Sequence, residues 1–258
     1  MTSKLVLALG AAFSLAASAA HAEGWIVSIG GRVSVAAPYE GADHYVLSPS
    51  PTLSARRADR PYRFNPGDGG TTFALIDTDH FVFGPMARFR YRRGDEGSLT
   101  GLRKVKWAAE PGAFMDIWPV DWLRLHGELR HGVVGHKGLV GDAGADLVFM
   151  GDKWDASIGP RFGWGNNKYM DRYFGVTPLE AARSPLIASA YDPDSGRRYT
   201  GVAVSSAYHL SDNLLIKLTA GYNKLASKAE NSPIVAIAGS SNQYLASAGV
   251  SYSFGIGR

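Results

Sequence analysis

The chain has 258 residues, a formal net charge of +4, 45% hydrophobic and 19% charged residues, and no cysteine. This balance is too apolar for a disordered chain, and the absence of cysteine excludes a disulfide framework, a cysteine-ligated metal site and a cysteine nucleophile. The length suits one large all-β domain or two small ones, and the small positive surplus gives no reason to expect a nucleic-acid partner.

The first 22 residues have the layout of a secretory signal peptide. Lys4 supplies a positive charge, an apolar stretch runs from Leu5 to about Ala17, and Ala20-His21-Ala22 places small residues at the −3 and −1 positions of a cleavage site. A transmembrane anchor is the alternative, but the stretch is shorter than the ~20 residues that span a bilayer. We therefore expect residues 1–22 to be removed and residues 23–258 to form one domain, exported beyond an inner membrane.

After the leader, apolar and polar residues alternate with a period of two, which predicts β-strands. In segment 81–92, for example, Phe83 and Phe89 share one face, and Arg88 and Arg90 share the other. About twelve strands are expected, within a range of roughly ten to fourteen, and an even number is typical of a single-chain bacterial barrel. The candidate strands are 24–36, 46–57, 61–65, 71–77, 80–93, 105–118, 121–134, 141–150, 153–164, 200–210, 212–224 and 243–255.

Such alternation occurs both in a soluble sandwich, where the apolar face is buried, and in a membrane barrel, where the apolar face meets lipid. Three features favour a transmembrane antiparallel β-barrel. The strands have the length of a tilted bilayer crossing. Their polar faces carry charges of both signs that can pair inside a barrel. Aromatic residues lie at strand ends, as in interfacial belts: Trp118, Trp122, Trp154, Trp164, Tyr208 and Tyr222.

The connections differ in length. Two are long, 166–199 and 226–242, and we expect both on one side of the barrel as functional loops, with the short turns on the other side. The first contains the best helical candidate, residues 178–183. Three prolines inside candidate strands, each close to a glycine, indicate a bulge or bend, or else a break between shorter strands: Pro85, Pro111 and Pro160.

The polar faces of the central strands predict a cluster of charges in the lumen. Its candidate members are Arg88, Arg90, Arg92, Glu110, Asp116, Arg124, Glu128 and Arg130. One interpretation is a patch that attracts anions or sets pore selectivity. The other, which we favour, is that the arginines pair with Glu110 and Asp116 across the barrel wall and nearly fill the lumen.

A hydrolase is the main enzymatic alternative. His209 and Ser211 lie on one face of a strand near a turn, an arrangement similar to the His-x-Ser pair of outer-membrane lipid A deacylases. A serine hydrolase also needs a third group to orient its histidine, and Ser-Asp-Asn is common turn chemistry. We therefore expect no enzymatic activity, no catalytic residues and no cofactor.

Metal binding has little support. His126, His131 and His136 recur at intervals of five, which puts the first two on opposite faces of one strand and prevents shared coordination. The aspartate pairs at 77/79 and 192/194 lack the dense oxygen-ligand loop that Ca²⁺ favours. We expect no metal site.

Four short blocks are distinctive and cover nearly all of the exported chain. They are Ala37–Tyr45 with Pro49-Ser50-Pro51, Glu128-Leu129-Arg130 with Gly135–Gly138, Gly159-Pro160-Arg161 with Tyr173–Val176, and Ser232–Val235 with Tyr252-Ser253-Phe254. In this order they resemble blocks of the MipA/OmpV family, the MltA-interacting-protein-like proteins of the Gram-negative outer membrane.

The resemblance implies a β-barrel embedded in outer-membrane lipid. It also implies a scaffold that docks peptidoglycan-remodelling enzymes at its periplasmic face, a lytic transglycosylase and a bifunctional peptidoglycan synthase. Other members of the family are linked to adhesion or to passage of small solutes. A narrow channel for small solutes is therefore the alternative function, with a lipid hydrolase third.

Overall fold

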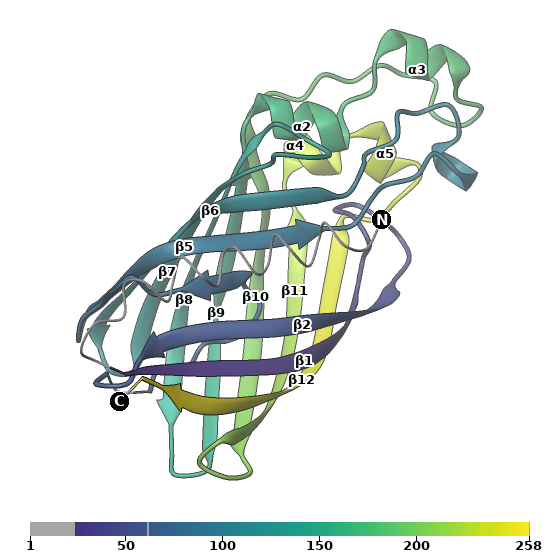
Figure 1. Cartoon of the computed structure of the whole chain (residues 1–258). Helices are drawn as coiled ribbons and strands as arrows, with labels where there is room; N and C mark the ends of the chain where they lie inside the picture. Colours follow the sequence, from purple (N-terminus) through teal and green to yellow (C-terminus); the bar gives the residue numbers. More distant parts are fainter. Residues whose placement is uncertain (1–23, 61, 258) are drawn as a thin grey trace.

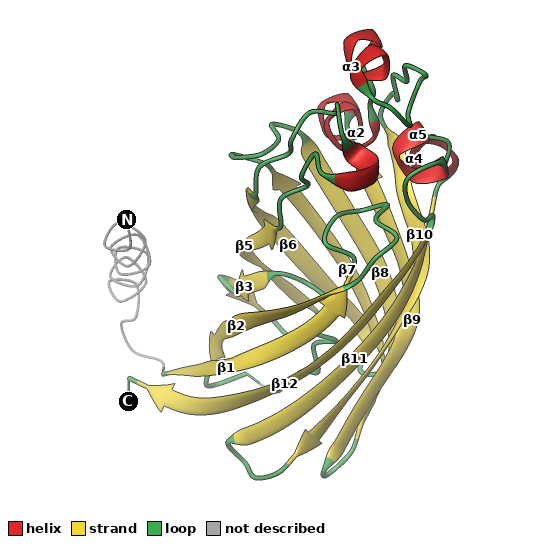
Figure 2. Ribbon diagram, turned by 90° about the vertical axis from the view of Figure 1, so that its right-hand side faces the viewer, coloured by secondary structure: helices red, strands yellow, loops and turns green. Residues whose placement is uncertain are grey.

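A computed structural model describes residues 24–60 and 62–257, and the expected signal peptide lies outside them. Antiparallel strands wrap around a central lumen, and short helices gather at one end (Figures 1 and 2). The strands are β1 (Trp25–Ala36), β2 (Val46–Arg57), β3 (Thr71–Phe73), β4 (Ile76–Asp77), β5 (Phe81–Arg90), β6 (Ala108–Val120), β7 (Leu123–His131), β8 (Leu139–Met150), β9 (Trp154–Gly165), β10 (Gly196–His209), β11 (Leu214–Leu225) and β12 (Asn242–Ile256).

These strands close into a ring. Within the described residues the 12-stranded sheet runs β3-β2-β1-β12 and then back in sequence order to β5 and β4, and β3 also pairs with β5. Because β4 pairs only with β5, eleven strands (12 minus one) form the ring. An odd ring cannot be antiparallel throughout, and the one parallel pair joins β2 to the three-residue β3. The sequence thus predicted the barrel and nearly its strand number, but not this mode of closure.

The two ends of the barrel differ. Trp25 pairs with Ile256, so β1 begins and β12 ends at the end of the barrel that carries the short turns 121–122, 151–153 and 210–213. In bacterial barrels this end is periplasmic. The two connections expected to be long, now bounded as 166–195 and 226–241, both lie at the opposite end, as predicted. The connection 91–107 lies there as well, and the sequence had not marked it as a long loop.

Helices occur in these long connections. They are η1 (Gly97–Leu99), α2 (Asn167–Phe174), α3 (Pro178–Arg183), α4 (Ser227–Glu230) and α5 (Pro233–Ala236). The expected helix at 178–183 is α3, which begins with a Thr177–Glu180 capping box and proline in its first turn. None of the helices within the described part of the chain is long and apolar enough to cross a membrane.

The apolar face of each long strand points outward. On β12, Tyr244, Val250 and Tyr252 are about half exposed, whereas Gln243 on the other face is buried. The same holds around the ring, where Phe89 of β5 is 56% and Leu218 of β11 is 54% exposed. Large exposed apolar side chains on every wall are what a lipid-facing surface requires.

Two predicted details are wrong. Residues 62–65 are not a strand but irregular backbone, and the candidate strand 71–77 divides into β3 and β4. By contrast β5, β6 and β9 run without a break through Pro85, Pro111 and Pro160, so these prolines do not separate shorter strands.

Candidate functional site

Side-chain size divides the lumen into two halves. The inward positions of β5 to β10 carry long charged residues, which fill their half. The inward positions of β1, β2 and β12 carry small residues with hydroxyl groups: Ser28, Ser34, Ser48, Ser50, Thr52, Ser54, Ser247, Ser251 and Ser253. Small side chains leave a cavity of about 1640 Å³ on this side.

Arg130 is the centre of the filled half and is fully buried. Its Nε donates to Glu110 Oε2 at 3.0 Å, and its two terminal nitrogens pair with Glu128 and Asp142. Arg88 reaches the same Glu128 at 3.3 Å. Buried charges are tolerated only when they are paired and hydrogen-bonded, and this arrangement supplies both.

A second group of charges lies nearer the periplasmic end. Arg124 pairs with Asp146 at 3.0 Å and with Asp116 at 2.8 Å. The ring of His126 bridges Asp116 at 2.6 Å and Glu128 at 3.0 Å, which links this group to Arg130.

A third group lies toward the extracellular end. Arg90 pairs with Glu110 and, at 3.1 Å, with Glu40 from the β1–β2 connection. Arg198 pairs with Glu40 and Asp142. His136 contacts Glu110 Oε1 at 2.8 Å, so this loop histidine is buried within the network rather than exposed.

Seven of the eight residues in the sequence-derived cluster come together in this way. Arg92 does not: it follows the end of β5 and is exposed, because the strand ends at Arg90 and the chain leaves the lumen there. Sequence reasoning missed several members that complete the network: Glu40, Asp68, Asp142, Asp146, Arg161, Arg198 and His136.

The network is nearly balanced in charge. Among the described residues it contains six arginines, namely 88, 90, 124, 130, 161 and 198, against seven carboxylates, namely 40, 68, 110, 116, 128, 142 and 146. His126 and His136 both contact carboxylates of this set. The six arginines of this network are therefore engaged in ion pairs. Of the expected pairings, Arg90 contacts Glu110, whereas Arg88 contacts Glu128 and Asp116 contacts Arg124.

Residues 62–70, here called the lumen segment, fold into the barrel and separate the two halves. Phe64 is buried against Trp118 and Val148 at the inner wall. The carbonyl of Pro66 accepts hydrogen bonds from Ser205 at 2.9 Å and from Thr219 at 2.8 Å.

Charged side chains also hold the lumen segment. Lys217 donates to the carbonyl of Asn65 at 2.6 Å, Arg32 donates to that of Gly67, and Arg161 pairs with Asp68 at 2.5 Å. Wall side chains thus satisfy the polar backbone of an irregular segment at membrane depth, as such a segment requires.

The extracellular end is covered by packed loops. Tyr169, Met170, Tyr173 and Phe174 of α2 are buried against Val105, Val140 and residues of α4 and α5. Burial raises the pKa of Tyr173 to about 12, so its phenol is neutral. Although partial burial alone would raise the pKa of Glu180, hydrogen bonds from Thr177 and the Arg103 backbone hold it below its usual value.

The alternative hydrolase pair is arranged as a strand end and a turn. His209 contacts Asp155 at 2.7 Å, whereas the Ser211 hydroxyl accepts a hydrogen bond from the Leu214 backbone at 3.2 Å. Within the described residues, no group of three or more histidine, aspartate and glutamate side chains is placed to hold a metal ion.

Comparison with protein families decides the class of this barrel. The model of the family described as "MltA-interacting protein MipA" matches residues 29–254, most of the chain. The chain belongs to the MipA family. With its lipid-facing apolar surface, it is a β-barrel protein of the outer membrane. A comparison with curated proteins gives no match.

Solved barrels are similar only in outline. The NanC porin is 11% identical, with a TM-score of 0.40. The match spans 89% of this chain and 100% of the porin chain. OprB of Pseudomonas putida is 9% identical, with a TM-score of 0.42 and coverage of 90% and 94%. The outer membrane protease OmpT of Escherichia coli is 9% identical, with a TM-score of 0.32 and coverage of 90% and 96%. Likenesses this low carry no argument about function.

Proposed function

We propose that this MipA-family barrel is an outer-membrane scaffold whose periplasmic face docks a peptidoglycan-remodelling enzyme, first of all a lytic transglycosylase. The observation that carries the proposal is the family match over residues 29–254, because the family is described by its interaction with MltA. A peptidoglycan synthase is the second partner in this proposal.

The filled half of the lumen supports a structural role. A ring of paired charges, an inserted segment and a packed extracellular cover connect strands β5 to β10 across the lumen. Such a wall gives a rigid platform, which suits a docking protein more than a general pore.

The periplasmic turns offer a surface for docking. Asp121, Asp152 and Asp212 lie one on each of the three short turns, all three are exposed, and none forms an ion pair with another described residue. With Lys153 as the one basic residue on the same turns, these carboxylates leave a negative surplus, which steers a positively charged partner and raises its association rate. We therefore expect the partner to present lysine and arginine side chains.

Interferometry with immobilised barrel and a purified lytic transglycosylase tests the proposal. The triple variant D121N/D152N/D212N should slow association by roughly tenfold at low salt and remove most of its salt dependence. Asp192 is exposed at the extracellular end, so D192N serves as a matched control and should bind as the unmodified chain does. Absence of binding by the unmodified chain would refute the proposal.

A narrow channel for small solutes is the second candidate, and the cavity favours it. The 1640 Å³ space is lined by Tyr62, His209 and Asp212 near the periplasmic turns and extends along β1 and β2. Planar-bilayer recordings separate the two functions, since steady single-channel steps support a channel and a silent bilayer supports the scaffold.

A further inference from the structure

The cavity carries positive charge that the protein does not neutralise. Of its lining carboxylates, Asp77 and Asp116 already pair with Arg63 at 3.7 Å and Arg124 at 2.8 Å, and Asp212 lies on an exposed periplasmic turn. Three further lining cations, Arg32, Arg56 and Lys217, form no ion pair with any other described residue. Their hydrogen bonds go to backbone carbonyls, the Lys217 ammonium also lies 5.4 Å from the centre of the Phe64 ring, and Asp68 on the lumen segment bonds Arg161 instead. The charge is therefore available to a ligand.

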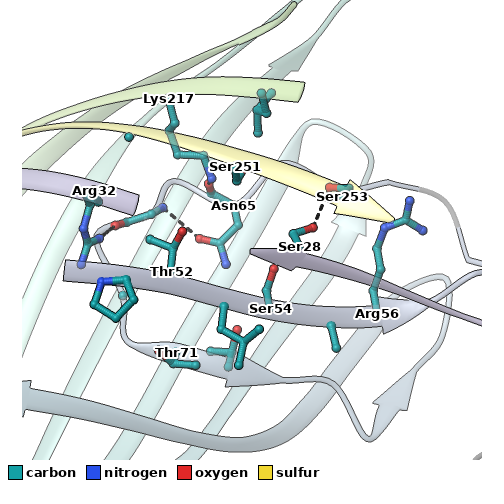
Figure 3. A pocket seen from close by; sticks show the side chains of 18 of the residues that line it. Ser28, Arg32, Thr52, Ser54, Arg56, Asn65, Thr71, Lys217, Ser251 and Ser253 are labelled. Atoms are coloured by element: carbon teal, nitrogen blue, oxygen red, sulfur yellow. Dashed lines mark hydrogen bonds between the residues drawn. The ribbon is translucent and has the colours of Figure 1, made fainter. Parts of the chain in front are cut away.

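Two of these cations converge on one space. Arg32 of β1 and Lys217 of β11 both lie opposite Gly249 of β12, which has no side chain to fill the gap between them. Figure 3 shows both side chains beside Asn65, with Arg56 at the other end of the cavity. Arg32 Nε is buried without a hydrogen-bond partner, and the Lys217 ammonium, which has three donors, makes one bond. An unsatisfied buried donor next to a cavity calls for an acceptor.

The rest of the lining can bind hydroxyl groups. Ser28 and Ser253 hydrogen-bond to each other at 2.7 Å across the β1–β12 pair, and Thr52 and Ser54 point into the same space (Figure 3). Serine and threonine hydroxyls both donate and accept. Combined with guanidinium and ammonium donors, they match a phosphate group that carries neighbouring hydroxyls.

The wall beside this cavity is open. β3 pairs with β2 only at Ser54 and Ala55, so the β2 edge from Val46 to Leu53 has no strand partner on that side within the described chain. At ~3.3 Å per residue this edge is roughly 25 Å long. Pro49 and Pro51 lie in it, and proline is confined to strand edges that need no N–H donor.

The opening has a defined position. The unpaired stretch is at the Val46 end of β2, opposite the end where Arg57 pairs with Trp25. This end of the barrel carries the long loops, so the opening lies in the extracellular half of the membrane. Arg32 lies opposite Ser50, within the unpaired stretch, so the cationic space is level with the opening. The cavity lining also includes Leu53 and Phe89, whose side chains are exposed on the outer, lipid-facing surface. Lumen and lipid are therefore connected at this point.

From this juxtaposition we propose that the cavity binds a phosphate-bearing, hydroxyl-rich headgroup, which enters sideways between β2 and β5 from the outer leaflet while its acyl chains stay in the membrane. Arg32 and Lys217 hold the phosphate, and the serine-rich wall holds the hydroxyls. The same chemistry would accept a soluble sugar- or glycerol-phosphate entering from the water. Arg32 and Lys217, which hold the phosphate, take no part in the proposed docking by the turn aspartates, so either proposal can fail without the other.

The test uses the purified exported chain in detergent and in nanodiscs. Native mass spectrometry should show retention of phosphatidylglycerol over phosphatidylcholine, because only the former joins a net negative phosphate to free hydroxyls. The double variant R32Q/K217Q should weaken this retention by about tenfold or more, since each substitution removes a charge-assisted hydrogen bond. R92Q removes an exposed cation outside the cavity and should leave retention unchanged.

The remaining arms identify the source of the ligand and guard against misfolding. Glycerol phosphate is the soluble form of the same headgroup. If glycerol phosphate competes only weakly with phosphatidylglycerol, the result supports lateral entry of a lipid. If glycerol phosphate binds as tightly as the lipid, and R32Q/K217Q loses this binding, the result supports the same site with a water-borne ligand. The charge-conserving R32K/K217R variant should restore binding. Equal retention of the two lipids, or unchanged binding by R32Q/K217Q, would overturn the proposal.

Discussion

Replacing Arg130 with methionine should destabilise the barrel more than any other single lumen substitution. The guanidinium is fully buried and contacts Glu110, Glu128 and Asp142. Methionine keeps most of the volume but leaves three carboxylates short of one cation. Breaking a buried ion pair by removing one partner costs about 3–5 kcal/mol, and we expect the free energy of unfolding to fall by that amount.

Urea unfolding of the barrel from lipid vesicles, followed by tryptophan fluorescence, measures this change. R92M is the control, because Arg92 is exposed and lies outside the network, and its effect should stay within about 0.5 kcal/mol. Adding Glu110→Gln to R130M removes one negative charge from a network that has lost a cation and should restore part of the loss. A decrease below about 1 kcal/mol for R130M would refute the reasoning that the arginine is needed to hold these carboxylates in the lumen.

Two more outcomes follow from neighbouring glycines and from one loop carboxylate. Gly30 faces inward and an added Cβ would overlap the backbone at Val250, whereas an added Cβ at Gly31 meets nothing within 4 Å. G30A should therefore lower the free energy of unfolding by about 1–3 kcal/mol in the urea assay, and G31A should leave it unchanged. Because the pKa of Glu180 is lowered in the folded loop, its stabilising effect is present above the usual value of 4.5 and is lost as pH falls through the folded value. Proteolysis of the extracellular loops should accordingly increase at acidic pH, and E180Q should be more sensitive than the unmodified chain near neutral pH; equal cleavage of both at all pH values would contradict this role.

The strands could be read from the sequence because each alternates between lipid and lumen, and both environments select side chains strongly. Residues 62–65 mimic this alternation, since Tyr62 and Phe64 are aromatic and Arg63 and Asn65 are polar. The flanking prolines at 61 and 66 and Gly67 work against a ladder, however, and Phe64 packs inside the barrel rather than against lipid. A period-two pattern alone does not distinguish these two apolar surroundings.

The ion network could be predicted only in part. Arg124 and Glu128 lie on one strand face, so their placement in the lumen follows from alternation. The pairing depends on register: Asp146 lies opposite Arg124 on β8 and pairs with it, whereas Asp142 lies opposite Glu128 and pairs with Arg130. The polar positions in 139–150 could have suggested both aspartates. Glu40 and Arg198 are 158 residues apart and meet because a loop folds inward, which no local pattern indicates.

Helix α2 was missed although its signal is present. Tyr169, Met170, Tyr173 and Phe174 recur at helical spacing, and Asn166 caps the first turn by accepting a hydrogen bond from the Tyr169 backbone. The segment lies in a connection whose length suggested a loop. Its apolar face is buried only because the end of the barrel supplies a surface for the helix to pack against.

Spin labelling along β11 measures most directly which face of the wall meets lipid. The chain has no cysteine, so single substitutions at positions 216 to 219 place one label each. In vesicles, labels at 216 and 218 should be relaxed by oxygen dissolved in lipid and protected from a water-soluble nickel relaxant, and labels at 217 and 219 should show little oxygen access. Reversal of this alternation, or equal access to the nickel relaxant at all four positions, would contradict the barrel described here.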